Sequence, residues 1–145
     1  MHDTTSQTVR QEVAINAAPE KVWAALVGEM GRWFISPEDG APMGLRLEAF
    51  PGGRFYRDLG EGAGHLWGHV QVIKPPTLLE LIGPMFISAP VLSHVAVRLV
   101  EQGGTTTLTL THAMHGAVEG EVLEKASAGW RHILEKGLKH HVEQH

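Results

Sequence analysis

The stretch EGEVLEKASAGWRHILEKGLKHHVE, residues 119–143, decides the fold. It contains no proline, and its apolar residues recur at steps of three or four positions: Leu123, Ala126, Trp130, Leu134, Leu138 and Val142. This spacing predicts one helix of roughly 25 residues and about 37 Å, with an apolar stripe along one side. Such a stripe is stable only when another surface covers it, so the rest of the chain must supply that surface.

Most of the remaining chain has the pattern of short β-strands. Thr8 to Asn16 alternates apolar and polar residues, and Pro19 then begins a helical segment that Gly28 and Gly31 divide into two short helices. Further strands are expected at residues 45–50, 54–59, 65–74, 78–82, 94–102 and 105–113. This order predicts an α+β fold, in which an antiparallel sheet of about six or seven strands wraps round the long helix.

The last two expected strands form a hairpin whose register can be derived. Gly103 and Gly104 make a two-residue turn, so Gln102 faces Thr105. Counting back from the turn places Val95 opposite His112 on the apolar, inward face of the pair. The register therefore predicts an inward histidine.

Composition limits the classes of function. At 145 residues the chain is expected to form one domain, with residues 1–7 as a disordered tail. Cysteine is absent, and the net charge of −4 argues against nucleic-acid binding. The first residues do not have the pattern of a signal peptide, and no apolar run is long enough for membrane insertion. We therefore expect a cytoplasmic protein.

Several motifs, taken in order, resemble one known family. They are Ala18 to Leu26 with Arg32-Trp33, Pro51 to Phe55, Gly68 to Val70 with Lys74 to Pro76, Leu108 to His112, and Gly129-Trp130. Together they resemble the START-like (SRPBCC) superfamily, which has the helix-grip fold, and within it the activator of heat-shock protein 90 ATPase homologue family. The resemblance spans roughly residues 8 to 143. It implies an apolar cavity between sheet and helix, with residues 36–43 and 83–93, which depart from the family pattern, at its mouth.

Three functions remain open on this resemblance. The first is binding of a small apolar or amphipathic molecule in the cavity, without a cofactor. The second is a cyclase- or hydrolase-like enzyme that uses the same cavity, and the third is a protein that stimulates a chaperone ATPase, in a family that includes stress proteins. An exposed edge strand or the apolar segment from Pro84 to Val91 could also pair two chains as a homodimer.

Ten residues are candidates for the cavity wall. They are Trp33, Phe55, Arg57, Trp67, Leu81, Val97, Leu110, His112, Trp130 and Leu134. Each apolar member could equally be ordinary core, and His112 could be a ligand contact or a core histidine held by a hydrogen bond. One of Arg54 and Arg57 should point inward, unless both form surface ion pairs. The indole N–H of Trp130 is expected to donate to a water or a ligand in the cavity.

A metal site is not expected. His65 and His69 lie four residues apart on one strand, which separates them by about 13 Å, too far to share an ion. A site would need His94, His112 or His115 to converge with a carboxylate, and His-Glu-x-x-His is absent. No serine has the setting of an activated nucleophile, so no catalytic residue is assigned.

Overall fold

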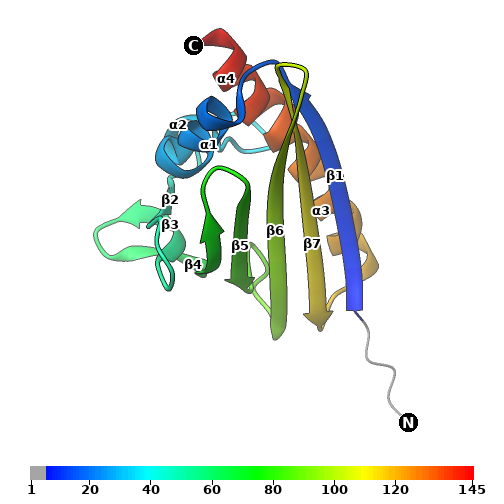
Figure 1. Cartoon of the computed structure of the whole chain (residues 1–145). Coiled ribbons are helices and arrows are strands. Elements are labelled where there is room, and N and C mark those ends of the chain that lie inside the picture. Colours follow the sequence, from blue (N-terminus) through cyan, green and yellow to red (C-terminus); the bar gives the residue numbers. More distant parts are fainter. Residues whose placement is uncertain (1–5) are drawn as a thin grey trace.

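The structure is a computed structural model that describes residues 6–145. Seven strands form one antiparallel sheet in the order β1-β7-β6-β5-β4-β3-β2. Their bounds are β1 Ser6–Ile15, β2 Leu45–Leu47, β3 Arg54–Gly60, β4 Ala63–Lys74, β5 Leu78–Gly83, β6 Val91–Gln102 and β7 Thr105–Gly116. The C-terminal helix crosses one face of the curved sheet (Figure 1). This arrangement confirms the α+β, helix-grip prediction.

The C-terminal helix is continuous but not uniform. It consists of α3 (Gly120–His132), the π-helical segment η1 (Ile133–Lys139) and α4 (His140–Gln144). Its predicted apolar stripe is buried from Ala126 to Val142, with exposed fractions of 5% or less at each stripe position. The widened η1 segment was not expected from the sequence, because an apolar spacing of three and four residues does not distinguish it from an α-helix.

Gly137 explains how closely η1 can pack. A Cβ atom at this position would lie 2.3 Å from the carbonyl oxygen of Trp33, in the short helix α2 (Met30–Trp33). Only a residue without a side chain permits that contact. Glycine therefore sets the distance between the C-terminal helix and α2.

The C-terminal helix is also tied to α1 (Pro19–Gly28) and its flank. Nε2 of His141 lies 2.6 Å from a carboxylate oxygen of Glu29, just beyond the end of α1. This hydrogen bond is the main cause of the lowered pKa of Glu29. Both short helices thus lie beside the far half of the C-terminal helix at one end of the sheet (Figure 1).

The predicted hairpin register is confirmed. Gln102 pairs with Thr105, and Val95 pairs with His112, whose side chain is fully buried. Other boundaries differ from expectation. Strand β2 ends at Leu47 rather than at Phe50, because the amide of Phe50 turns back to the carbonyl of Glu48. The expected tail is wrong for Ser6 and Gln7, which begin β1, and its first five residues lie outside the described part of the chain.

Candidate functional site

A hollow of about 240 Å³ lies between the sheet and α3. We call it the inner hollow. Its wall is mainly apolar and is formed by Phe34, Pro37, Met43, Trp67, Phe86, Ala126, Gly129, Trp130 and Ile133, with Glu38 and Lys125 as its charged members. The long helix and the sheet supply opposite sides of this space. Its composition is typical of a site for an apolar molecule.

Five aromatic rings form a closed circuit at the inner hollow. The centroid distances are 5.7 Å for Phe34–Trp67, 6.0 Å for Trp67–Phe86, 6.0 Å for Phe86–His112, 6.1 Å for His112–Trp130 and 5.9 Å for Trp130–Phe34. Interplanar angles between 64° and 88° make every neighbouring pair edge-to-face, a favourable arrangement of ring quadrupoles. Residues from five separate segments of the chain are thereby held together.

His112, on β7, is the member of this circuit between Phe86 and Trp130. The indole N–H of Trp130 donates to its Nδ1 at 3.0 Å. The expectation that Trp130 would donate to a water or a ligand is therefore wrong, because the inward histidine on β7 lies directly under the helix. Burial lowers the pKa of His112 to about 4, so the imidazole is neutral at pH 7.

Three buried polar atoms have no hydrogen-bond partner within residues 6–145. They are Nε1 of Trp67, Oγ of Ser93 and Nε2 of His112. All three residues are at most 4% exposed. Buried polar groups normally have partners, so each of these atoms requires an explanation.

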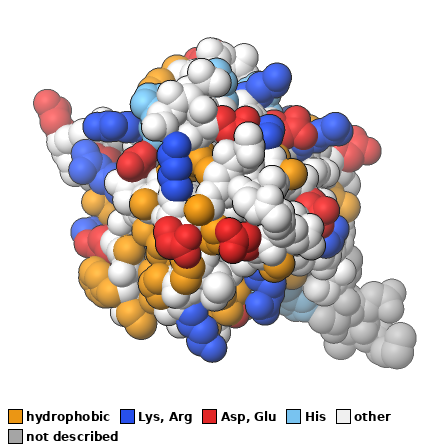
Figure 2. Space-filling view, turned by 45° about the horizontal axis from the view of Figure 1, so that its top comes forward, with side chains coloured by type: hydrophobic (Ala, Val, Ile, Leu, Met, Phe, Trp, Pro, Cys, Tyr) orange, Lys and Arg blue, Asp and Glu red, His pale blue; other side chains and the backbone are white. Residues whose placement is uncertain are grey.

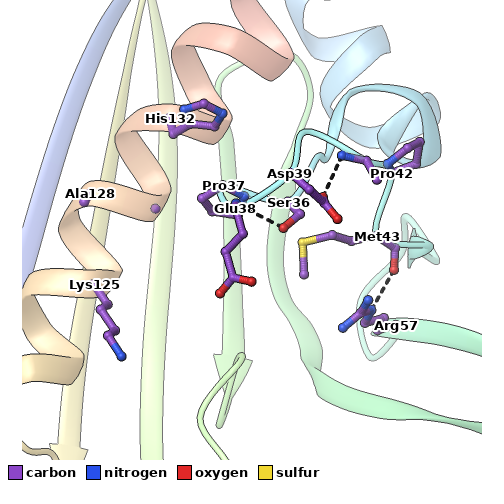
Figure 3. A pocket seen from close by; sticks show the side chains of 12 residues that line it. Ser36, Pro37, Glu38, Asp39, Pro42, Met43, Arg57, Lys125, Ala128 and His132 are labelled. Atoms are coloured by element: carbon purple, nitrogen blue, oxygen red, sulfur yellow. Dashed lines mark hydrogen bonds between the residues drawn. The ribbon is translucent and has the colours of Figure 1, made fainter.

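A second, more polar hollow of about 740 Å³ adjoins the first, and we call it the outer hollow. It lies between the loop 36–43, Arg57 of β3 and the α3 residues Lys125, Ala128, Gly129 and His132. Lys125 extends from the helix and Arg57 from the opposite side, with Glu38 reaching in from the loop (Figure 3). The two hollows share part of their walls, including Met43 and Gly129. The loop 36–43 lies at the mouth, as the resemblance implied.

The two arginines of β3 have different environments. Arg57 donates from Nε to the carbonyl of Met43 at 2.9 Å and is half-buried at the outer hollow. Arg54 instead pairs with Glu48 at 2.9 Å on the surface, where the guanidinium lowers the pKa of that carboxyl to about 2. The inward arginine is therefore Arg57.

The ten candidate residues separate into groups. Trp67 and Trp130 line the inner hollow, Arg57 lines the outer hollow, and His112 lies behind the wall in contact with Trp130. The others do not line either hollow and are core residues: Trp33, Phe55, Leu81, Val97, Leu110 and Leu134. Trp33 donates its indole N–H to the carbonyl of Ala25 at 2.7 Å, away from the cavity.

Sequence reasoning did not name several wall residues. Phe34, Phe86 and Ile133 complete the apolar wall, and Glu38 and Lys125 bring charge to its edge. Phe86 lies in the apolar segment after β5, so that segment already contained a signal. No pattern in the sequence distinguished Phe34 from its neighbour Trp33, although the two side chains are both buried and only one faces the hollow.

The surface supplies little further chemistry. Basic and acidic side chains are interspersed on the face drawn in Figure 2 rather than gathered by sign. Within residues 6–145, no three histidine or acidic side chains converge as metal ligands. None of the helices in this same part of the chain has both the length and the apolar character needed to span a membrane.

Comparison with protein families identifies the chain's relatives. The profile of the Activator of Hsp90 ATPase homolog 1-like proteins matches residues 16–143. The chain belongs to this family. Among curated proteins, none matches the chain significantly.

Solved structures share the fold of this chain. Protein MLL2253 from Mesorhizobium loti superposes with a TM-score of 0.72 at 20% identity, over 95% of this chain and 98% of its own. CV1439 from Chromobacterium violaceum superposes with a TM-score of 0.71 at 19% identity, and the match covers 94% of this chain and 96% of CV1439. DynU16, a protein in the dynemicin biosynthetic locus, gives 0.69 at 22% identity, over 94% of this chain and 47% of its own.

Proposed function

We propose that the protein binds a small apolar or amphipathic molecule between the sheet and the C-terminal helix. The observation that carries this proposal is the aromatic-walled inner hollow that adjoins the polar outer hollow. The apolar part of the ligand occupies the first, and a polar end reaches Arg57 and Lys125 in the second. Binding then removes apolar ligand surface from water, which is favourable by about 25 cal/mol per Å².

Size and family membership support this function. Apolar cavities of roughly 150 Å³ hold benzene, and the inner hollow, at about 240 Å³, has room for a larger ring system. Membership of the family is consistent with ligand binding. One structural relative, DynU16, is a protein in the dynemicin biosynthetic locus.

Gly129 offers a direct way to test the proposal. It lines both hollows, and a Cβ there would meet only Cγ of Pro37 at an ordinary 3.6 Å. Gly129→Ala should therefore be accommodated, whereas the longer side chain of Gly129→Leu should extend into the cavity. Both variants keep or improve helix propensity.

The experiment is native mass spectrometry of the wild type and both variants, purified in parallel from the source organism, followed by denaturation to release bound compounds. We expect one apolar compound per chain on the wild type and on Gly129→Ala, and its loss from Gly129→Leu. A compound retained equally by Gly129→Leu would contradict binding in this cavity.

A further inference from the structure

Arg57 is a half-buried cation without a counter-ion at the outer hollow. Its Nε–H donates to the carbonyl of Met43, which restrains the orientation of the guanidinium group. The terminal nitrogens, Nη1 and Nη2, form no hydrogen bond or ion pair within residues 6–145. These two nitrogens form a planar fork that matches the two oxygens of a carboxylate. Because the group is partly removed from water, it gains more from a counter-ion than an exposed cation does.

Two carboxylates that could neutralise Arg57 have other partners. Asp58, the next residue on β3, pairs with Arg46 at 3.2 Å. Asp39, which also lines the outer hollow, accepts from the backbone N–H of Ala41 at 2.9 Å. Both acids are therefore already engaged.

Glu38 is the acid that a bound anion would meet. Its carboxylate lines both hollows and forms no ion pair in the described part of the chain. In the view of Figure 3 it lies between Lys125 and Arg57. Glu38 is exposed, so water screens its charge more than that of Arg57. It reduces the attraction for an anion without cancelling it.

The two cations lie where the hollows join. Arg57 is bonded to Met43, and Met43 lines both hollows. Lys125 also lines both, and it forms no ion pair within residues 6–145. A molecule whose apolar part fills the inner hollow therefore presents its polar end to these two side chains.

We propose, on the basis of the binding function above, that the ligand is an aromatic carboxylic acid whose carboxylate binds the Nη1–Nη2 fork of Arg57, with Lys125 as a second cation. Its aromatic part packs against the rings of Phe34, Trp67 and Trp130 in the inner hollow. Glu38 weakens binding by repulsion, because it places the same chemical group in the same space.

Two probes of the same shape isolate the charge. 2-Naphthylacetic acid is ionised at pH 7, and 2-naphthylacetamide is neutral. Isothermal titration calorimetry of the wild type should give an affinity for the acid about 10-fold higher than for the amide, because hydrogen bonds to charged groups are stronger. The pair is repeated with 3-(2-naphthyl)propionic acid and its amide, so that the length of the linker does not decide the result.

Substitutions at Arg57 test the fork. In Arg57→Met the acid-to-amide ratio should fall to about one or below, because Glu38 then repels the acid without compensation. Arg57→Lys keeps the charge but not the fork, so it should retain only part of the preference. Arg54→Met is the matched control: Arg54 is on the same strand but pairs with Glu48 on the surface, and the ratio should not change.

Glu38→Gln should act in the opposite direction. It removes the repelling charge from an exposed position, so affinity for the acid should rise about threefold while affinity for the amide stays the same. A measurement on the wild type alone checks the same attraction. Raising NaCl from about 50 to about 500 mM should weaken binding of the acid several-fold and leave binding of the amide unchanged, because salt screens charges.

The outcomes separate the two proposals. A ratio near one for the wild type in both probe pairs, a ratio that Arg57→Met leaves unchanged, or weaker binding of the acid to Glu38→Gln would overturn the inference and leave the binding function in place. Gly129→Leu should abolish binding of acid and amide alike. Binding that survives this change, or failure of the wild type to bind any of the probes, would overturn both proposals.

Discussion

The indole N–H of Trp130 donates to Nδ1 of His112 at 3.0 Å, across the interface between the C-terminal helix and strand β7 of the sheet. Both residues are buried, with exposed fractions of 5% and 0%. This hydrogen bond fixes the rotation of the helix about its axis relative to β7. It also orients the Trp130 ring that forms one wall of the inner hollow.

A double-mutant cycle should detect this bond. Trp130→Phe and His112→Phe remove one partner each, and either change leaves the other polar group buried and unpaired. We expect a coupling energy of about 1 kcal/mol in urea unfolding. Trp23→Phe combined with His112→Phe is the control, and those two effects should add within about 0.5 kcal/mol. Additivity of the Trp130 pair would show that the bond contributes nothing.

The burial of His112 predicts a pH dependence of stability. Its pKa is lowered from 6.5 to about 4 in the folded state, so the unfolded chain binds the proton more tightly. The contribution of His112 is therefore complete above pH 6.5 and is lost as the pH falls toward 4. Between pH 7 and pH 5 the free energy of unfolding should fall by about 2 kcal/mol from this residue alone.

His112→Asn isolates that effect, because the amide can still accept from Trp130 but does not titrate. Urea unfolding is followed by tryptophan fluorescence at pH 7 and pH 5. Between these two pH values the free energy of unfolding should fall by about 2 kcal/mol less in this variant than in the wild type. Equal losses in the two proteins would mean that His112 is not the residue responsible.

Two glycines of the C-terminal helix should respond oppositely to alanine. In Gly137→Ala the new Cβ would lie 2.3 Å from the carbonyl oxygen of Trp33, so backbone must move; overpacking of this kind costs about 1–3 kcal/mol. In Gly129→Ala the nearest atom is 3.6 Å away, and the gain in helix propensity should stabilise by up to about 1 kcal/mol. Thermal unfolding of both variants checks the signs, and destabilisation by Gly129→Ala would contradict the described contact with Pro37.

Arg57 should hold the loop at the mouth. Its Nε–H donates to the carbonyl of Met43, and Arg57→Met removes that bond while it keeps much of the side-chain volume. Without this hydrogen bond the loop should be less stable against local opening by about 1 kcal/mol, and the amide hydrogen exchange rate at Met43 should therefore rise roughly fivefold. Arg54→Met is the matched control on the same strand, because the exposed Arg54 pairs with Glu48, and this variant should leave amide hydrogen exchange in residues 36–43 unchanged.

The fold was predictable because its signals are periodic. The helical spacing through Trp130 and the alternation on either side of Gly103 specify which faces are buried. The register of the β6–β7 hairpin could be derived by counting residues back from its turn. The cavity was less predictable, because an inward residue can fill the core or line a space. Leu110 and Trp67 both point inward, yet only Trp67 lines the inner hollow. Whether an inward residue fills the core or lines the hollow depends on the curvature of the sheet and on the loops around Met43 and Phe86. No local sequence pattern specifies that curvature or those loop conformations.

The most direct test of ligand binding in this cavity uses the indole N–H signals of the four tryptophans. A two-dimensional ¹⁵N–¹H spectrum, assigned by single Trp→Phe variants, is recorded while 9-fluorenone, a flat and mainly apolar three-ring probe, is titrated into the wild type. Trp67 and Trp130 line the hollow, so their indole signals should shift saturably, whereas the signals of Trp23 and Trp33 should change little. Shifts confined to Trp23 or Trp33, or no shifts at saturating fluorenone, would contradict it.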